Sequence, residues 1–99
     1  MIVEFVVAAG KKEQGRSWAR VDDGAITARG EGAPAEAADV TFTATPPLAQ
    51  GLHDGTLDLS VGFMRGEVKM SGDFGVLLQL LPLTHGPAPR VPVAELLPA

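Results

Sequence analysis

The most constraining feature of this sequence is a leucine-rich segment between Asp73 and Pro82. Asp73 is a good helix N-cap, and the residues that follow are spaced as in an apolar helix. The apolar side chains cover most of the circumference of that helix: Phe74, Val76, Leu77, Leu78, Leu80 and Leu81. Such a helix must be buried on more than one side. One side can pack on a sheet, and the other needs a partner chain, a lipid or the C-terminal tail.

The strands that could receive this helix are indicated by their alternation. Residues 2–9 form a β-branched apolar run, typical of a strand covered on both faces. Residues 16–30 predict a hairpin that turns at Asp22-Asp23-Gly24, where glycine tolerates a positive φ. Residues 39–45 and 67–72 alternate apolar and polar side chains, as half-buried strands do.

Two further helices are possible between the last two strands. Thr45 can cap the first, two prolines suit its first turn, and Gly55 can end it. The segment 56–64 is ambiguous. Its leucine, valine and phenylalanine residues alternate as in a strand. The segment could instead be a short helix that begins after an N-cap at Asp58 and ends at Gly66. Periodicity alone favours the strand.

The last residues of the chain are rich in proline. Pro82 is expected to end the leucine-rich helix, and the segment 84–99 should run extended over the surface. Val93, Leu96 and Leu97 could fold back as a short lid. The expected organisation is therefore one domain over residues 1–83, followed by a tail.

Composition excludes several classes of function. The chain has 99 residues, no cysteine and a net charge of −4 spread without runs of like sign, which argues against nucleic-acid binding and disulfides. No apolar run is long enough to span a membrane, and Glu4 interrupts the first one, which lacks the basic start of a signal peptide. We therefore expect a cytoplasmic, soluble protein with no transmembrane segment.

An ordered set of residues in the second half of the chain resembles the sterol carrier protein type 2 domain. In that family an aspartate opens a strand, a Gly-x-Leu step follows a helix, and a Phe-Met-x-Gly segment leads into a strand that ends in Gly-Asp. The corresponding residues here are Asp39, Gly55, Leu57, Phe63, Met64, Gly66, Gly72 and Asp73. The similarity extends over about residues 2–83.

The resemblance implies an α+β fold: a five-stranded, mostly antiparallel sheet with three short helices packed on one face. It also implies that the segment leading into Met64 is helical, and we prefer this to the strand that periodicity favours. The helices and sheet of that family enclose an apolar cavity for fatty acyl chains, sterols or other lipids.

One departure from the family concerns the first strand. Members usually begin with one or two helices, whereas this chain enters a strand at Ile2. Without those helices part of the sheet would be uncovered. We therefore expect a homodimer or a protein partner, or alternatively a shallower pocket.

The resemblance implies a pocket lined by apolar side chains from the helices and the last strand. We expect the lining to be Leu48, Leu52, Phe63, Met64, Val68, Met70, Phe74, Leu77, Leu78 and Leu81. Each of these could instead be ordinary core, although flexible methionine suits a surface that accepts varied apolar shapes. Arg65 and Lys69 could meet a headgroup or could be solvated surface charges.

The chemistry of an enzyme is poorly supported. His53 beside Asp54, His85 and the pair Asp22-Asp23 are the candidates, and each is explained as well by an exposed helix end, the tail or a turn. Asp73 is best explained as a cap. We assign no catalytic residue, no metal ligand and no cofactor.

The predicted function is non-catalytic binding of an apolar ligand. The alternatives are a dehydratase- or cyclase-like enzyme acting on a bound hydrophobic substrate and a protein interaction module.

Overall fold

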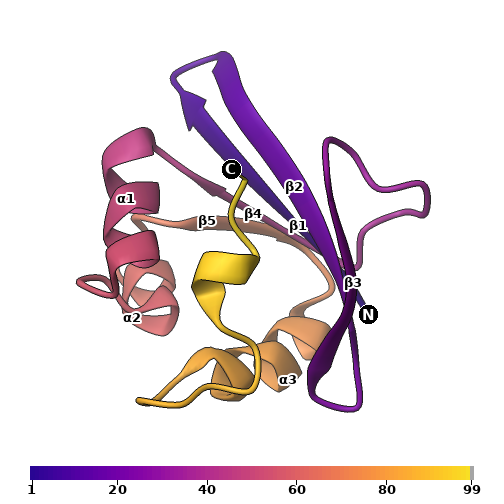
Figure 1. Ribbon diagram of the computed structural model, residues 1–99. Coiled ribbons are helices and arrows are strands. Elements are labelled where there is room, and N and C mark those ends of the chain that lie inside the picture. Colours follow the sequence, from indigo (N-terminus) through magenta and orange to yellow (C-terminus); the bar gives the residue numbers. More distant parts are fainter. Residues whose placement is uncertain (99) are drawn as a thin grey trace.

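The computed structural model describes residues 1–98, and their elements follow the order expected for the α+β fold (Figure 1). The strands are β1 (Ile2–Ala9), β2 (Lys12–Asp22), β3 (Ala25–Glu31), β4 (Val40–Ala44) and β5 (Lys69–Gly72). The helices are α1 (Pro46–Asp54), α2 (Leu59–Met64) and α3 (Phe74–Thr84), and a short 3-10 helix, η1 (Val93–Glu95), lies in the tail.

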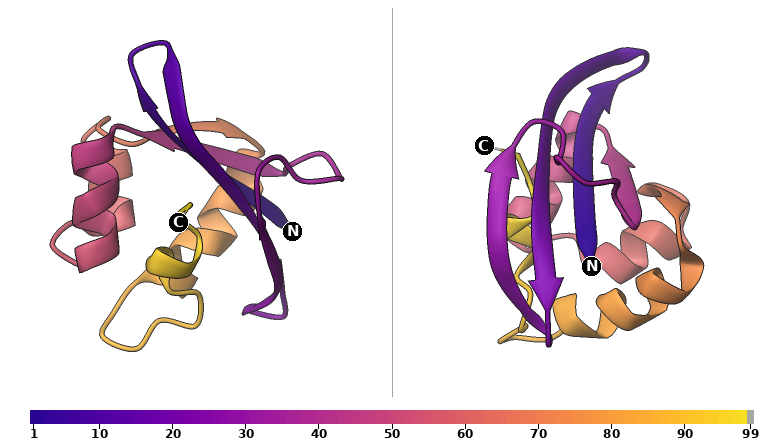
Figure 2. Two further views of the ribbon diagram at one scale, coloured as in Figure 1. Left: turned by 45° about the horizontal axis from the view of Figure 1, so that its top comes forward. Right: turned by 90° about the vertical axis from the view of Figure 1, so that its right-hand side faces the viewer.

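The strands form one five-stranded sheet in the order β3-β2-β1-β4-β5. β1 and β4 pair in parallel at its centre, and the other neighbours are antiparallel. All three helices and η1 lie on the same side of the sheet (Figures 1 and 2). The predicted fold, a mostly antiparallel sheet with helices on one face, is confirmed.

The face of the sheet beneath the helices, here called the inner face, carries the hydrophobic core. In β1 it presents Val3 and Phe5, and in β4 it presents Val40 and Phe42, all at most 1% exposed. The rings of Phe5 and Phe42 face each other across the parallel pair, with centroids 5.9 Å apart. Because apolar burial on this scale dominates folding free energy, the inner face holds the helices in place.

The ambiguous segment is helical. Asp58 caps α2 by accepting a hydrogen bond from the backbone N–H of Val61 at 3.2 Å. Gly62 lies so close to Val68 that an added Cβ would stand 2.9 Å from it. The prediction from family resemblance was right and the one from periodicity was wrong, because the cap and this close packing outweigh a local alternation of apolar residues.

The junction between β5 and α3 explains two residues of the family pattern. Gly72 has a φ of +113°, and a Cβ there would lie 2.3 Å from the backbone oxygen of Asp39. Only glycine fits this position without a backbone shift. Asp73 then caps α3 through the N–H groups of Gly75 and Val76, at 2.8 and 3.2 Å.

Pro82 does not end α3, which continues to Thr84. A proline deprives a helix of one backbone hydrogen bond and usually breaks it in the interior. Here it removes the bond that a backbone N–H would have given to the carbonyl of Leu78, and α3 extends only two residues beyond it. The hydroxyl of Thr84 donates to the carbonyl of Leu81 at 2.8 Å and helps to complete the last turn.

The opposite face, here called the outer face, is not the bare apolar surface that the sequence analysis predicts. Its apolar residues in β1, Ile2 and Val6, are only 6% and 8% exposed. Between them Glu4 is 7% exposed and accepts a hydrogen bond from Arg16 at 2.8 Å. Polar and aromatic side chains of the sheet lie on this face, and Arg20 pairs there with Glu36 of the loop between β3 and β4. A homodimer or partner on this face remains a prediction.

Arg16 bridges two carboxylates on the outer face. Its guanidinium binds Glu4 at 2.8 Å and Glu13 at 2.6 Å. Hydrogen bonds to Glu13 and Glu4 raise the pKa of Arg16 above its usual value. The hydrogen bond from Arg16 lowers the pKa of Glu13. Both shifts favour the charged forms of Arg16 and Glu13 at neutral pH.

Candidate ligand-binding site

The C-terminal tail occupies the space between the inner face and the helices (Figure 1). Val91, Leu96 and Leu97 are 0%, 2% and 4% exposed and belong to the same core as Phe5 and Phe42. The prediction that this segment runs over the surface was therefore wrong for its buried residues, whereas the fold-back considered for Leu96 and Leu97 agrees with their burial. Its prolines make it extended, but its three apolar residues are drawn into the interior by burial.

Two side chains of the sheet hydrogen-bond the backbone of this tail. The hydroxyl of Ser17, in β2, donates to the carbonyl of Leu96 at 2.6 Å. The guanidinium of Arg29, in β3, donates to the carbonyl of Leu97 at 3.3 Å. Ser17 is 0% exposed, so its hydroxyl needs a partner inside the protein. The tail thus combines apolar contacts with two polar anchors.

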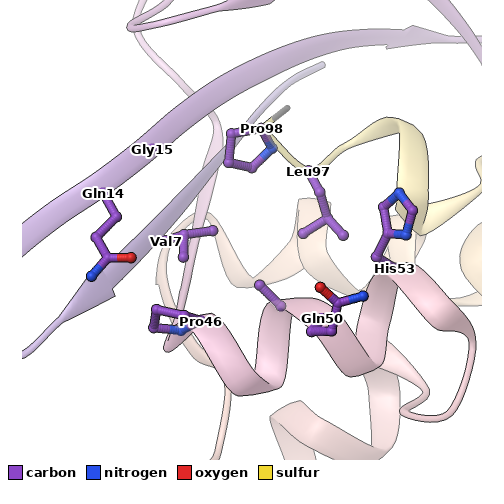
Figure 3. Close-up of a pocket in the computed structure, with 9 residues that line it drawn as sticks. Val7, Gln14, Gly15, Pro46, Gln50, His53, Leu97 and Pro98 are labelled. Carbon is purple, nitrogen blue, oxygen red and sulfur yellow. The ribbon is translucent and has the colours of Figure 1, made fainter.

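An open groove of about 380 Å³ runs along the edge of this tail (Figure 3). It lies between the end of the β1–β2 hairpin, the exposed side of α1 and the last described residues. The residues that line it are Val7, Gln14, Gly15, Pro46, Ala49, Gln50, His53, Leu97 and Pro98. Apolar groups form much of its wall, and two amides and an imidazole supply its polar groups. It is suited to an amphiphile better than to a highly charged ligand.

A smaller groove of about 250 Å³ is lined in part by η1. Its walls come from the end of α1, the start of α2 and the tail, including Leu52, Leu57, Pro92 and Val93. Both grooves therefore border the same tail. Leu97, which lines the larger groove, is also part of the buried core.

The structure separates the predicted lining residues into three groups. The first is buried in the core and consists of Leu52, Val68 and Leu77. The second is half-buried and packs against that core: Leu48, Phe63, Met70 and Leu81. The third is exposed on the helices and consists of Met64, Phe74 and Leu78, at 82%, 57% and 57%. Of all ten residues, only Leu52 borders one of the two grooves described here.

The two basic residues considered for a headgroup lie away from the grooves. Arg65 is 3.6 Å from Glu67, and its side chain is 66% exposed. Lys69 pairs with Thr43 in the β4–β5 ladder and is exposed. The residues that reasoning from sequence missed are Ser17 and Arg29, along with Gln14 and Gln50 of the groove. No local pattern marks them, because a serine or arginine in a strand is unremarkable until the tail packs against it.

The candidate acid–base residues form no enclosed site in the part of the chain that the structure describes. His53 borders both grooves, and its ring lies 3.8 Å from the carboxylate of Asp54, with both side chains at least half exposed. His85 lies 3.2 Å from Asp58 at the surface. Among residues 1–98, no group of three histidine, aspartate or glutamate side chains could hold a metal ion.

A separate observation concerns membranes. Within residues 1–98, each helix is too short or too polar to cross a bilayer.

Comparison with known proteins identifies the fold and its family. The sequence model of the SCP-2 sterol transfer family matches residues 2–84. The chain belongs to this family. The resemblance predicted from Asp39 to Asp73 is thereby confirmed. No curated protein sequence matches the chain significantly.

Solved structures of the same family superpose on most of the SCP-2 domain. Sterol carrier protein 2-like 2 from Aedes aegypti, in its palmitated form, has a TM-score of 0.65 at 16% identity and covers 86% of this chain and 72% of its own. The crystal structure of that protein has a TM-score of 0.62 at 15% identity, covering 81% and 69%. At these identities the likeness shows the fold alone.

A further likeness is to part of an enzyme. The stereoselective inverting sec-alkylsulfatase from Pseudomonas sp. has a TM-score of 0.59 at 25% identity. The match covers 96% of this chain but only 14% of the sulfatase. An SCP-2 fold thus also occurs as a small part of a larger protein.

Proposed function

We propose that this protein binds an apolar ligand without catalysis, holding a fatty acyl chain, a sterol or another lipid between the inner face and the helices. The observation that carries the proposal is the tail itself. Leu96 and Leu97 fill this compartment as a short peptide, attached to the rest of the domain by the segment after α3. An apolar compartment closed by a chain end can exchange that end for another apolar molecule.

The lid would be the tail, residues 84–99, and the binding domain would be residues 1–83. Burying a leucine side chain contributes about 2 kcal/mol, so the two leucines together contribute roughly 4 kcal/mol. A ligand with ten buried methylenes gains roughly 8 kcal/mol before ordering costs. Val91 adds to the burial of the tail, and a free ligand also loses several kcal/mol on association, so only a long alkyl chain gains enough to displace the tail.

Two comparisons support this class of ligand. Family membership associates the chain with sterol transfer, and the related Aedes aegypti protein has been solved in a palmitated form. With the tail displaced, the inward residues among the predicted set, Met70, Leu77 and Leu81, would line the enlarged compartment together with Leu52. The absence of cysteine fits the reducing cytoplasm, where we place this activity.

Native mass spectrometry of freshly purified protein, followed by organic extraction, tests the proposal. We expect a stoichiometric lipid mass, or uptake of a fluorescent alkyl probe by lipid-free protein. The variant Ala49→Trp should block the groove beside the tail and lower probe affinity at least tenfold. The variant Ala37→Trp is the matched control, because Ala37 is exposed in the loop between β3 and β4 and lines neither groove, so its substitution should leave affinity unchanged. Failure to bind any long-chain probe would overturn the proposal.

A further inference from the structure

The contacts that hold the tail also point to the headgroup of the ligand. We infer that Ser17 and Arg29 form a headgroup site for an anionic, oxygen-bearing amphiphile, either a carboxylate or a sulfate ester. The carbonyl groups of Leu96 and Leu97 occupy this site when no ligand is bound. This inference rests on the proposed function and names its ligand class.

Ser17 supplies the first donor. It lies on the inner face of β2, directly opposite Phe5 in the antiparallel register, and is 0% exposed. Its hydroxyl donates to the carbonyl of Leu96 at 2.6 Å. If the tail moves, the hydroxyl loses this acceptor in an apolar interior. Because a buried polar group without a partner is costly, the incoming ligand should bring an acceptor oxygen to the same place.

Arg29 supplies the second donor and the charge. It pairs with Ala19 in the β2–β3 ladder, two residues along β2 from Ser17 and therefore on the same face. Its guanidinium donates to the carbonyl of Leu97 at 3.3 Å, and Glu31 lies 3.8 Å away. A guanidinium has five N–H donors, so Glu31 leaves others for a headgroup. An anionic oxygen accepts from arginine more strongly than the neutral carbonyl that it would replace.

The tail therefore resembles such a ligand in its chemistry. Leu96 and Leu97 present two apolar groups to the core and two acceptor oxygens to Ser17 and Arg29. A fatty acid or an alkyl sulfate joins the same components: an apolar chain and at least two oxygens on one atom. Such a ligand differs from the tail in one respect: its headgroup brings a negative charge to Arg29, whereas the carbonyl of Leu97 is neutral.

The groove beside the tail offers no equivalent site. Its lining residues include no lysine or arginine. The amide nitrogen of Gln50 already donates to Asp54 at 2.9 Å, so its free oxygen is an acceptor. An anion would find here only the N–H groups of Gln14 and His53, and neither has the permanent charge of a guanidinium. The groove is better suited to the apolar chain, and Arg29 to its charged end.

The test measures selectivity for headgroups in the full chain. Dodecanoate, dodecyl sulfate and dodecanol, each below its micellar concentration, compete with a fluorescent alkyl probe. We expect both anions to bind at least about tenfold more tightly than the alcohol. A hydrogen bond between charged groups changes a binding affinity by about that factor or more. Arg29→Gln should reduce that ratio to about two while leaving the affinity for the alcohol unchanged.

Arg65→Gln is the matched control. Arg65, like Arg29, faces a glutamate two residues along the chain, and both are partly exposed. Arg65 lines neither groove and should keep the full preference for anions. Equal affinity for acid and alcohol, or a preference that survives Arg29→Gln, would overturn the inference and leave the proposed function standing. Failure of all three ligands to bind would instead overturn the proposed function. A preference for only one anion would assign the site to carboxylates or to sulfates.

Discussion

The two faces of the sheet bury adjacent residues of β1 in different ways. Phe5, on the inner face, is 0% exposed and stacks on Phe42. Glu4, on the outer face, is 7% exposed and is held by Arg16 at 2.8 Å and by the hydroxyl of Thr41 at 3.2 Å. The inner face buries side chains through apolar contacts, which have no preferred direction. The outer face buries Glu4 through hydrogen bonds, which require donors and acceptors in the right places.

This difference has a consequence for ligand binding. Apolar contacts accept any molecule of suitable size, so the inner face can exchange the tail for a lipid. The outer face cannot make such an exchange, because a carboxylate that loses its cation is left charged and poorly solvated. The two faces should therefore respond differently to substitution, and the following changes test that expectation in order of decreasing effect.

The largest effect is expected for Phe42→Ala on the inner face. Removal of a fully buried ring should lower the free energy of unfolding by about 3–5 kcal/mol, because a cavity remains where the ring stood. Phe42→Leu, which conserves more volume, should cost about 1 kcal/mol. Urea denaturation followed by circular dichroism measures both. A cost below about 1 kcal/mol for the alanine variant would show that the inner face is not tightly packed.

A smaller loss is expected for Arg16→Met on the outer face. It leaves the carboxylate of Glu4 without its cation, although the 32% exposure of the Arg16 side chain allows water to reach the site. We expect a cost of about 2 kcal/mol. The double variant Glu4→Gln, Arg16→Met should recover much of it, since no charge is then buried. Additive costs in this cycle would contradict coupling between the two residues.

The aromatic cover of the outer face gives a third, still smaller effect. A Cβ at Gly30 would lie 2.7 Å from Nε1 of Trp18, so Gly30→Ala must displace the ring. We expect a cost of about 1 kcal/mol and a shift of tryptophan emission to longer wavelength as the ring becomes more exposed. Trp18 is the single tryptophan of the chain, so the emission reports on it alone. Unchanged emission would mean that the ring does not cover this strand.

The smallest effect is expected from the titration of Glu13. Its folded pKa is lowered by the hydrogen bond from Arg16. The contribution to stability is therefore present above the unfolded pKa and is lost as the pH falls through the lower, folded value. Carboxyl-carbon NMR should show this lowered pKa and its return toward the usual value in Arg16→Met. An unchanged Glu13 titration in that variant would rule out the contact as the cause.

Much of the fold could be predicted from sequence because it depends on local patterns. The strands 39–45 and 67–72 alternate, and Asp73 caps a helix with a characteristic apolar spacing. The segment before Met64 required family resemblance, since its alternation is that of a strand although it forms α2. Pro82 was misjudged for a related reason: whether a helix ends at a proline depends also on the contacts of the residues after it, and Thr84 is buried and bonded to Leu81.

The candidate site was predicted less well, because it depends on which residues meet in space. Leucine-rich helices and a proline-rich tail are visible in the sequence, and they determine that this chain has more apolar surface than a small sheet alone can cover. The sequence also determines the family, through glycines and caps whose backbone geometry few other residues allow. Only the tertiary structure decides that the tail covers that surface. Its contact between Ser17 and Leu96 joins residues 79 positions apart, and no local rule of spacing reaches across such a separation.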